Sequence, residues 1–192
     1  MFDRIRAFLG ITGAHGILRR YLVVNGFDGA LTMLGLVVGF YLSGTTDLRV
    51  IIGACVGAAV ALAVSGFSSA YISETAEKQK ELRELEQAMI HDLGESIHGR
   101  ASRLLPVLVA LVNGMSPFII SLLIISPILA AYLSIDLPVA PLEAAFVVAL
   151  GVLFTLGIYL GTISGISWFW AGMRALMIAL VTSVIIVGLN LL

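Results

Sequence analysis

One acidic residue, Asp28, lies near the front of an otherwise apolar stretch over residues 21–40. A charged side chain is costly in hydrocarbon, so a carboxylate at this place is a functional-site hypothesis by default. Because a low-dielectric environment disfavours the charged form, Asp28 can exchange a proton for a cation near neutral pH. The alternative is a protonated carboxyl group that only holds two helices together through a Ser or Asn partner. Of the two, we favour the exchange of a proton for a cation.

Further oxygen and sulfur atoms come from two other apolar stretches. Ser65 and Ser69 lie near the end of the second stretch. Asn113 and Met115 come just before Pro117, and a proline removes one backbone hydrogen bond and can free a carbonyl oxygen for an ion. These residues are candidate metal ligands. The alternative, which is the stronger one for these residues alone, is hydroxyls bonded to their own helix and a methionine that only packs.

The connection between the second and third apolar stretches carries most of the charge in the chain. A helix with about 100° per residue gathers four of its carboxylates on one face, namely Glu74, Glu77, Glu81 and Glu84. Such carboxylates repel one another unless a cation neutralises them, and hard oxygen ligands suit a divalent ion. The alternative, which this face taken alone favours, is a solvated surface whose acids pair with Lys78 and Lys80. Asp92 and Glu95 would join this face if Gly94 did not break the helix.

The elements that must position these residues are transmembrane helices. The chain has 192 residues, of which 59% are hydrophobic and only 12% charged, a balance outside the usual range of soluble domains. Its apolar runs reach the length of about 20 residues that a helix needs to cross a hydrocarbon core of about 30 Å. The alternating pattern of a membrane barrel is absent, so the fold class is all-α. We predict a bundle of five spans, at residues 21–43, 50–73, 103–133, 142–164 and 168–192.

Two segments of a different character accompany the spans. Residues 1–20 are expected to form an amphipathic helix on the membrane surface, because Phe2, Ile5 and Leu9 share one face. Residues 21–73 hold the first two spans, residues 74–102 the amphipathic acidic helix in the cytosol, and residues 103–192 the last three spans. Pro117 and Pro127 predict a kink or a tilt in the third span.

Pairs of glycines four residues apart recur within the spans. Gly53 and Gly57 form one such pair, and Gly157 and Gly161 form another. Small residues at this spacing let helix backbones approach closely in lipid, so both pairs predict helix packing and not a function.

The basic residues indicate how the chain is oriented in the membrane. Those near the span ends lie almost all on one side: Arg4, Arg6, Arg19, Arg20, Lys78, Lys80, Arg83, Arg100, Arg103 and Arg174. Arg49 falls on the other side. An odd number of spans then places the N-terminus and residues 74–102 in the cytosol and the C-terminus outside, in the cell membrane if the chain is prokaryotic. We expect no removable signal peptide, since no compact apolar stretch with a small-residue cleavage site opens the chain.

Several functions are disfavoured by what the sequence does not contain. No nucleophile elbow, Walker loop or His-Glu-x-x-His motif occurs, so we do not expect an enzyme. No basic run or aromatic platform supports the binding of nucleic acid. Cys55 is the only cysteine, which excludes a disulfide within the chain and a cysteine cage for a metal from one subunit. We also expect no permanently bound cofactor.

Three segments of the chain resemble the vacuolar iron transporter family. The segment DGALTMLGLVVG at residues 28–39 is similar to the Asp-Gly-x-x-Thr motif of the family's first span, in which the Asp is a transport residue. The segment ALAVSGFSSAYISETAE at residues 61–77 resembles the second-span motif, and residues 165–192 resemble the last span more weakly. Members of this family move ferrous iron or manganese out of the cytosol in exchange for protons. The resemblance therefore implies this activity and matches the acids after residue 73 to the family's metal-binding helices.

The chain departs from the family at three positions, one of which is Ala70, where the family has a Glu before the tyrosine. Ala58 stands where the family usually has a Glu, and Gly66 stands where it has a metal-binding Met. Family members form dimers with the ion path between the subunits, so a homodimer is implied, with two copies of Asp28 facing each other across its axis. Without the thioether, the preference for softer transition metals should fall.

Together these features predict a homodimeric, proton-coupled transporter that moves Mn²⁺ or Fe²⁺, as its substrate, across the lipid bilayer and out of the cytosol. Its predicted metal-binding residues are Asp28, Ser65, Ser69, Glu74, Glu77, Glu81, Glu84, Asn113 and Met115. A different hypothesis, motivated by Ala58 and Gly66, is a membrane scaffold or regulator that keeps the transporter fold without transport. The acidic helix would then bind a partner.

Overall fold

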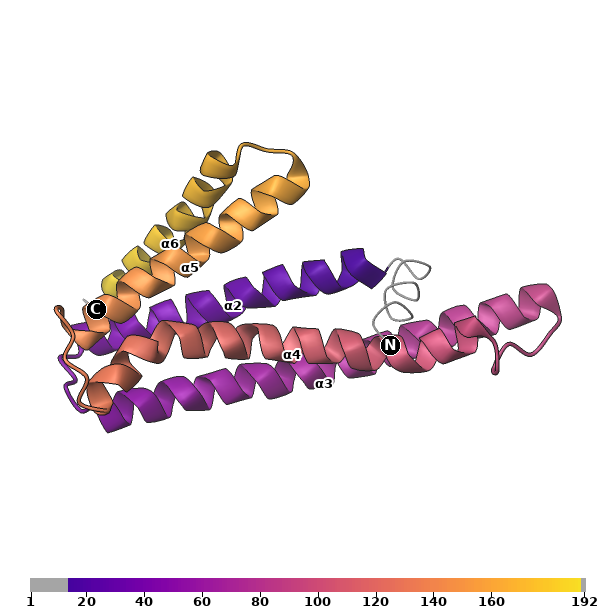
Figure 1. The fold of residues 1–192 in the computed structure, drawn as a ribbon, viewed down its shortest axis with the longest axis horizontal. Helices are drawn as coiled ribbons and strands as arrows, with labels where there is room; N and C mark the ends of the chain where they lie inside the picture. The colour runs from indigo at the N-terminus through magenta and orange to yellow at the C-terminus, as the bar shows by residue number, and fades with distance from the viewer. Residues whose placement is uncertain (1–13, 191–192) are drawn as a thin grey trace.

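The computed structural model describes residues 14–190, which form five long helices (Figure 1). They are α2 (Ala14–Leu42), α3 (Leu48–Met89), α4 (Ile97–Tyr132), α5 (Pro141–Ser164) and α6 (Trp168–Asn190). This part of the chain contains no strand, and each helix is long and apolar enough to cross a membrane. The predicted all-α fold class is confirmed, and the chain is an integral membrane protein whose environment is a lipid bilayer. Of the surface helix expected over residues 1–20, residues 1–13 lie outside the described residues.

Helix α3 continues without a break from the second span into the acidic segment. The side chain of Asp47 caps its start by accepting a hydrogen bond from the Arg49 N–H at 2.9 Å. The helix has 42 residues, so at 1.5 Å per residue it is about 63 Å long, about twice the thickness of a hydrocarbon core. The boundary expected at residue 74 is therefore not a break, because residues 74–89 are rich in the strong helix formers Glu, Lys, Gln, Ala and Leu.

The chain turns back between α3 and α4 at residues 90–96. Ile90 adopts the left-handed conformation with a φ of 52°, which ends α3. The hydroxyl of Ser96 accepts a hydrogen bond from the Gly99 N–H and caps the start of α4. Asp92 and Glu95 lie in this turn, so they do not extend the acidic face of α3.

Helix α2 contacts all four of the other helices, whereas α3 packs mainly along α4 and α6 packs mainly along α5. The largest core cluster includes side chains of α2, α4 and α5, of which Met33, Ile124 and Leu153 are fully buried. This central place of α2 means that its faces are covered by different neighbours along its length.

The two glycine pairs have different surroundings. A Cβ atom at Gly157 would lie 2.8 Å from the carbonyl oxygen of Ala171, so this glycine permits the close crossing of α5 and α6. At Gly53 and Gly57 a Cβ atom would meet nothing within 4 Å. The predicted packing is confirmed for Gly157, while the other pair lies on an open face of α3.

The helices converge at one end of the molecule and diverge toward the other (Figure 1). We call these the Asp47 end and the Arg19 end, after a residue close to each. At the Arg19 end α2 begins, α5 ends and α6 begins, while α3 and α4 extend beyond the other helices. The hairpin of α5 and α6 diverges from α2 toward the Arg19 end.

Three prolines, Pro106, Pro117 and Pro127, lie inside α4. Each lacks an N–H and so leaves one carbonyl of the preceding turn without its helical partner. For Pro127 this is the carbonyl of Leu123, to which the hydroxyl of Ser126 donates at 2.7 Å. The last turns of α4 leave the line of the rest of the helix (Figure 1), in accordance with the predicted kink.

Candidate functional site

Asp28 lies at the middle of the 29-residue helix α2, on an exposed face. Its neighbours face elsewhere: a Cβ atom at Gly29 would lie 2.8 Å from Cα of Pro117, so this glycine packs directly on α4. Among residues 14–190 no hydrogen bond or ion pair is formed by the Asp28 carboxylate. One chain alone therefore does not bury this group, in contrast to the desolvated environment expected from the sequence.

A network of amides joins α2, α3 and α4 one turn from Asp28. The side-chain amide of Asn25 donates to the carbonyl of Tyr21 at 2.9 Å and also to the side-chain oxygen of Asn113. The amide nitrogen of Asn113 in turn donates to the carbonyl of Gly66 at 2.6 Å. We call Asn25, Asn113 and Gly66 the asparagine crossing. Asn113 is only 5% exposed, and its side-chain oxygen and nitrogen both form hydrogen bonds with neighbouring helices.

The asparagine crossing explains the glycine at position 66. A Cβ atom there would lie 2.9 Å from the carbonyl oxygen of Asn113 and 3.4 Å from Cα of Gly114. That carbonyl is the one that Pro117 releases from the helical pattern, and it faces the backbone of α3. A methionine, the residue of the vacuolar iron transporters, does not fit at position 66 without a movement of α4.

The other predicted ligands within the spans lie on outer faces. Ser65, Ser69 and Met115 are all exposed. The hydroxyl of Ser69 donates to the Gly66 carbonyl of its own helix at 3.3 Å, and Met115 is 45% exposed although Asn113 on the same helix is buried. None of these side chains is hydrogen-bonded to Asp28 in the part of the chain that the structure describes.

Two carboxylates on the acidic face of α3 form ion pairs with lysines of the same helix. Glu81 lies 2.6 Å from the ammonium group of Lys78, and Glu84 lies 3.8 Å from that of Lys80. Glu74 accepts a hydrogen bond from the Tyr21 hydroxyl at 3.0 Å. Glu77 is exposed. Over residues 14–190 no three His, Cys, Asp or Glu side chains are gathered closely enough to hold a metal ion. The pairing with Lys78 and Lys80 matches the alternative that the sequence left open.

Three residues that join the helices were not among the predicted site residues. Tyr21 links α2 to α3 through Glu74, and Asn25 links α2 to α4. The Ser116 hydroxyl donates to the Leu22 carbonyl at 2.6 Å and forms a second link between α2 and α4. Their signal in the sequence is a polar side chain within an apolar span, either one or two turns before Asp28 or next to a proline.

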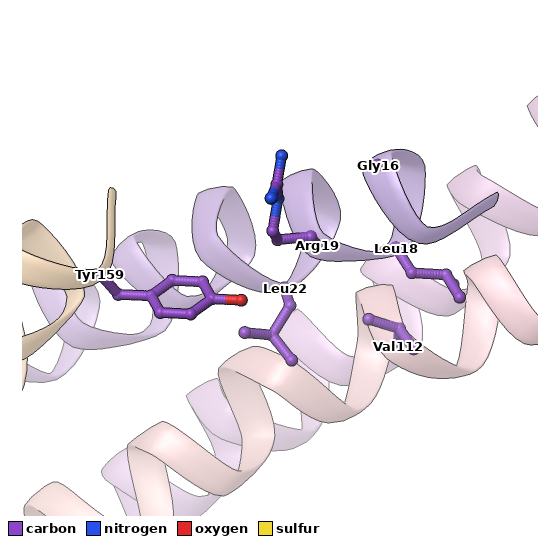
Figure 2. A pocket seen from close by; sticks show the side chains of 6 residues that line it. All are labelled: Gly16, Leu18, Arg19, Leu22, Val112 and Tyr159. Atoms are coloured by element: carbon purple, nitrogen blue, oxygen red, sulfur yellow. The ribbon is translucent and has the colours of Figure 1, made fainter. Parts of the chain in front are cut away.

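A cavity of about 360 Å³ lies at the Arg19 end, between α2, α4 and α5 (Figure 2). It is lined by Gly16, Leu18, Arg19, Leu22, Val112 and Tyr159. Figure 2 shows the Tyr159 hydroxyl directed toward Leu22, whereas the Arg19 side chain extends away from Leu22 and Val112. Asp28 does not line this cavity, so the two features are separate.

Comparison with known proteins gives one informative relationship. The chain is 31% identical over 148 residues to a protein of Methanocaldococcus jannaschii with the name "Uncharacterized protein MJ0645". The matched region covers 76% of this chain and 74% of that protein. The chain belongs to the family of MJ0645. No family model matches the chain, and no solved structure matches it.

Proposed function

We propose that this protein is a proton-coupled transporter that moves a divalent metal ion, Mn²⁺ or Fe²⁺, out of the cytosol. The observation that carries the proposal is the Asp28 carboxylate, exposed at the middle of an apolar helix. Ionisable groups at such a depth almost always face a protein interior or a water-filled path, because contact with lipid is too costly. The similarity of residues 28–39 and 61–77 to the vacuolar iron transporters supports the choice of substrate.

A second copy of the chain would supply the environment that Asp28 lacks. In a twofold dimer the same surface meets itself, so one Asp28 brings its counterpart to the axis. Two facing carboxylates form a better site for a hard divalent ion than one does. In this arrangement the pair binds metal when ionised and releases it on protonation, which couples metal movement to a proton gradient.

The proposed orientation has the Arg19 end in the cytosol. Arg19 and Arg20 near the start of α2, together with Arg174 in α6, give this side its excess of positive charge. The acidic extension of α3 then lies in the cytosol, where it attracts cations toward the membrane. A metal ion that binds there displaces Lys78 and Lys80 from their carboxylate partners.

The direct test is metal flux into proteoliposomes with an imposed pH gradient, comparing Mn²⁺, Fe²⁺, Mg²⁺ and Ca²⁺. We expect gradient-dependent flux of Mn²⁺ or Fe²⁺ for the native chain and its loss for Asp28→Asn. The matched control is Asp136→Asn in the exposed turn after α4, which should transport normally. Both variants must have the oligomer size and the unfolding midpoint of the native protein. Undiminished flux in Asp28→Asn would overturn the proposal.

A second candidate is a membrane scaffold that retains this fold without transport. It is favoured by the pairing of Glu81 and Glu84 with lysines, and by the lack of a metal cluster among the described residues. This candidate predicts no flux of any ion and no metal-dependent rise in the unfolding temperature of folded, dimeric protein. The same proteoliposome experiment, combined with thermal unfolding in each metal, therefore separates the two candidates.

A further inference from the structure

We propose that the cavity at the Arg19 end binds an anionic phospholipid, with an acyl chain against its apolar wall and the phosphate at Arg19. The apolar wall consists of Leu18 and Leu22 on α2 and Val112 on α4. The volume of the cavity, about 360 Å³, falls within the range of ligand pockets, about 300–1,000 Å³. A lipid site here depends neither on metal binding nor on Asp28.

The two polar residues of the cavity lie at the same level of the membrane. Arg19 and Tyr159 line the same cavity, and Tyr159 comes five residues before the end of α5. Five residues of helix correspond to about 7.5 Å, so Tyr159, and with it the cavity that Arg19 also lines, lies just inside the Arg19 end. Arginine at such a depth extends its charge toward the headgroups while its stem remains among apolar groups. Figure 2 shows the Arg19 side chain extending away from Leu22 and Val112, as expected for an arginine that reaches toward the headgroups.

Aromatic residues support the same level for the membrane surface. Trp168 and Trp170 begin α6 at the Arg19 end and are 56% and 65% exposed. Tryptophan is enriched at the boundary between hydrocarbon and headgroups, where its ring meets both environments. The mouth of the cavity therefore lies where the phosphate and glycerol of a phospholipid lie.

Charge selects an anionic lipid as the occupant. Arg19 forms no ion pair with a carboxylate among residues 14–190, and Arg20 beside it lies over the ring of Tyr21 at 5.7 Å. A guanidinium group binds a phosphate through two parallel hydrogen bonds, and the Tyr159 hydroxyl can donate to an ester or glycerol oxygen. The cavity is lined from both α2 and α5, so a lipid chain bound there lies between these two helices.

The first experiment measures lipid retained by the full chain, by native mass spectrometry after purification from vesicles of equal phosphatidylglycerol and phosphatidylcholine. We expect selective retention of phosphatidylglycerol by the native chain. Arg19→Gln should retain at least about tenfold less, since the loss of one hydrogen bond between charged groups already accounts for about a factor of ten and this variant loses two. Leu22→Trp, which fills the cavity without a change of charge, should lose retention as well. Inorganic phosphate should not displace the lipid, and displacement by phosphate alone would overturn the assignment to a lipid.

The matched control is Arg103→Gln, since Arg103 is an exposed arginine of α4 on the same side of the membrane. Arg103→Gln should retain phosphatidylglycerol as the native chain does. An equal loss in Arg19→Gln and Arg103→Gln would mean that general positive charge holds the lipid, and the proposal would be wrong. All variants must keep the native helix content and unfolding midpoint, and native retention in both Arg19→Gln and Leu22→Trp would also refute the site.

A second measurement identifies the occupant even if one of these variants fails to fold. A photoreactive phenylalanine derivative at position 22 of the full chain reports, after irradiation in the same vesicles, which molecule lies against it. An adduct with phosphatidylglycerol supports the proposal. An adduct with residues 1–13 of the same chain, or with a second copy, assigns the cavity to protein and overturns it.

Discussion

Asn113 of α4 donates a hydrogen bond from its side-chain amide to the carbonyl of Gly66 of α3, at 2.6 Å. The bond lies at a point where the two backbones approach closely: a Cβ atom at Gly114 would lie 2.6 Å from the carbonyl of Ala63. An Asn113 side chain that is 5% exposed and bonded to the backbone of α3 fixes the position of α3 against α4. We therefore expect the primary effect of changes at positions 66 and 113 to be on stability.

Gly66→Ala is predicted to destabilise the protein by about 1–3 kcal/mol, because the added methyl group meets a backbone carbonyl that cannot move away by rotation. The control is Gly151→Ala, since a Cβ atom at Gly151 meets nothing within 4 Å. That control should be neutral or gain up to about 1 kcal/mol from helix propensity. Reversible denaturant unfolding in detergent measures both. Equal stability of the two variants would contradict the close contact at position 66.

Asn113→Leu is predicted to cost about 1–3 kcal/mol, because it removes both hydrogen bonds of the Asn113 side chain, to the Gly66 carbonyl and from the Asn25 amide. Met115→Leu on the same helix is the control, since this exposed side chain tolerates a swap of similar volume. Unfolding free energies in detergent compare the two. If Asn113→Leu keeps native stability but loses metal-dependent transport, Asn113 is a ligand instead of a helix-joining residue.

Tyr21→Phe is predicted to weaken the contact between α2 and α3, because it removes the hydrogen bond to Glu74. The expected loss is about 1 kcal/mol, with faster amide hydrogen exchange around Glu74. Tyr132→Phe, at an exposed tyrosine of the Asp47 end, should change neither quantity. Unchanged exchange in Tyr21→Phe would show that this bond does not hold the helices together.

Replacing both Lys78 and Lys80 by Gln is predicted to raise the affinity of the acidic face for Mn²⁺, because Glu81 and Glu84 lose their cationic partners. The loss of helix stability should be small, since such pairs contribute about 0.2–0.5 kcal/mol each. Titration calorimetry on the full chain measures the affinity. Arg83→Gln is the control, because Arg83 bonds to the Gln79 carbonyl and to no carboxylate of the described residues. If the double variant binds Mn²⁺ no more tightly than Arg83→Gln does, the acidic face is not a metal-binding site.

The sequence was sufficient to predict the fold class and the existence of five spans, because both depend on composition and on the length of apolar runs. It did not predict that α3 has no break after residue 73. The chain there changes from apolar to charged, yet it consists of residues that favour helix, and a change of solvent alone does not end a helix.

The surroundings of individual side chains depend on which helix covers which face, and periodicity does not provide this information. Gly53 and Gly157 belong to the same kind of glycine pair, yet only Gly157 packs against another helix within the chain. In the same way, Asp28 and Gly29 are adjacent in sequence, but Gly29 packs on α4 while Asp28 is exposed. The predicted metal ligands lie on different faces of their helices, so one chain does not bring them together. The metal-ligand set therefore stays a prediction.

The unbroken length of α3 has a mechanical consequence. A helix without a hinge from Leu48 to Met89 tilts as one rod, so a small rotation near the Asp47 end displaces the acidic tip through a larger arc. Any change in packing within the bilayer is thereby magnified at the tip, where a soluble molecule can sense it. Conversely, a load on the tip reaches the interior of the bundle through a single element.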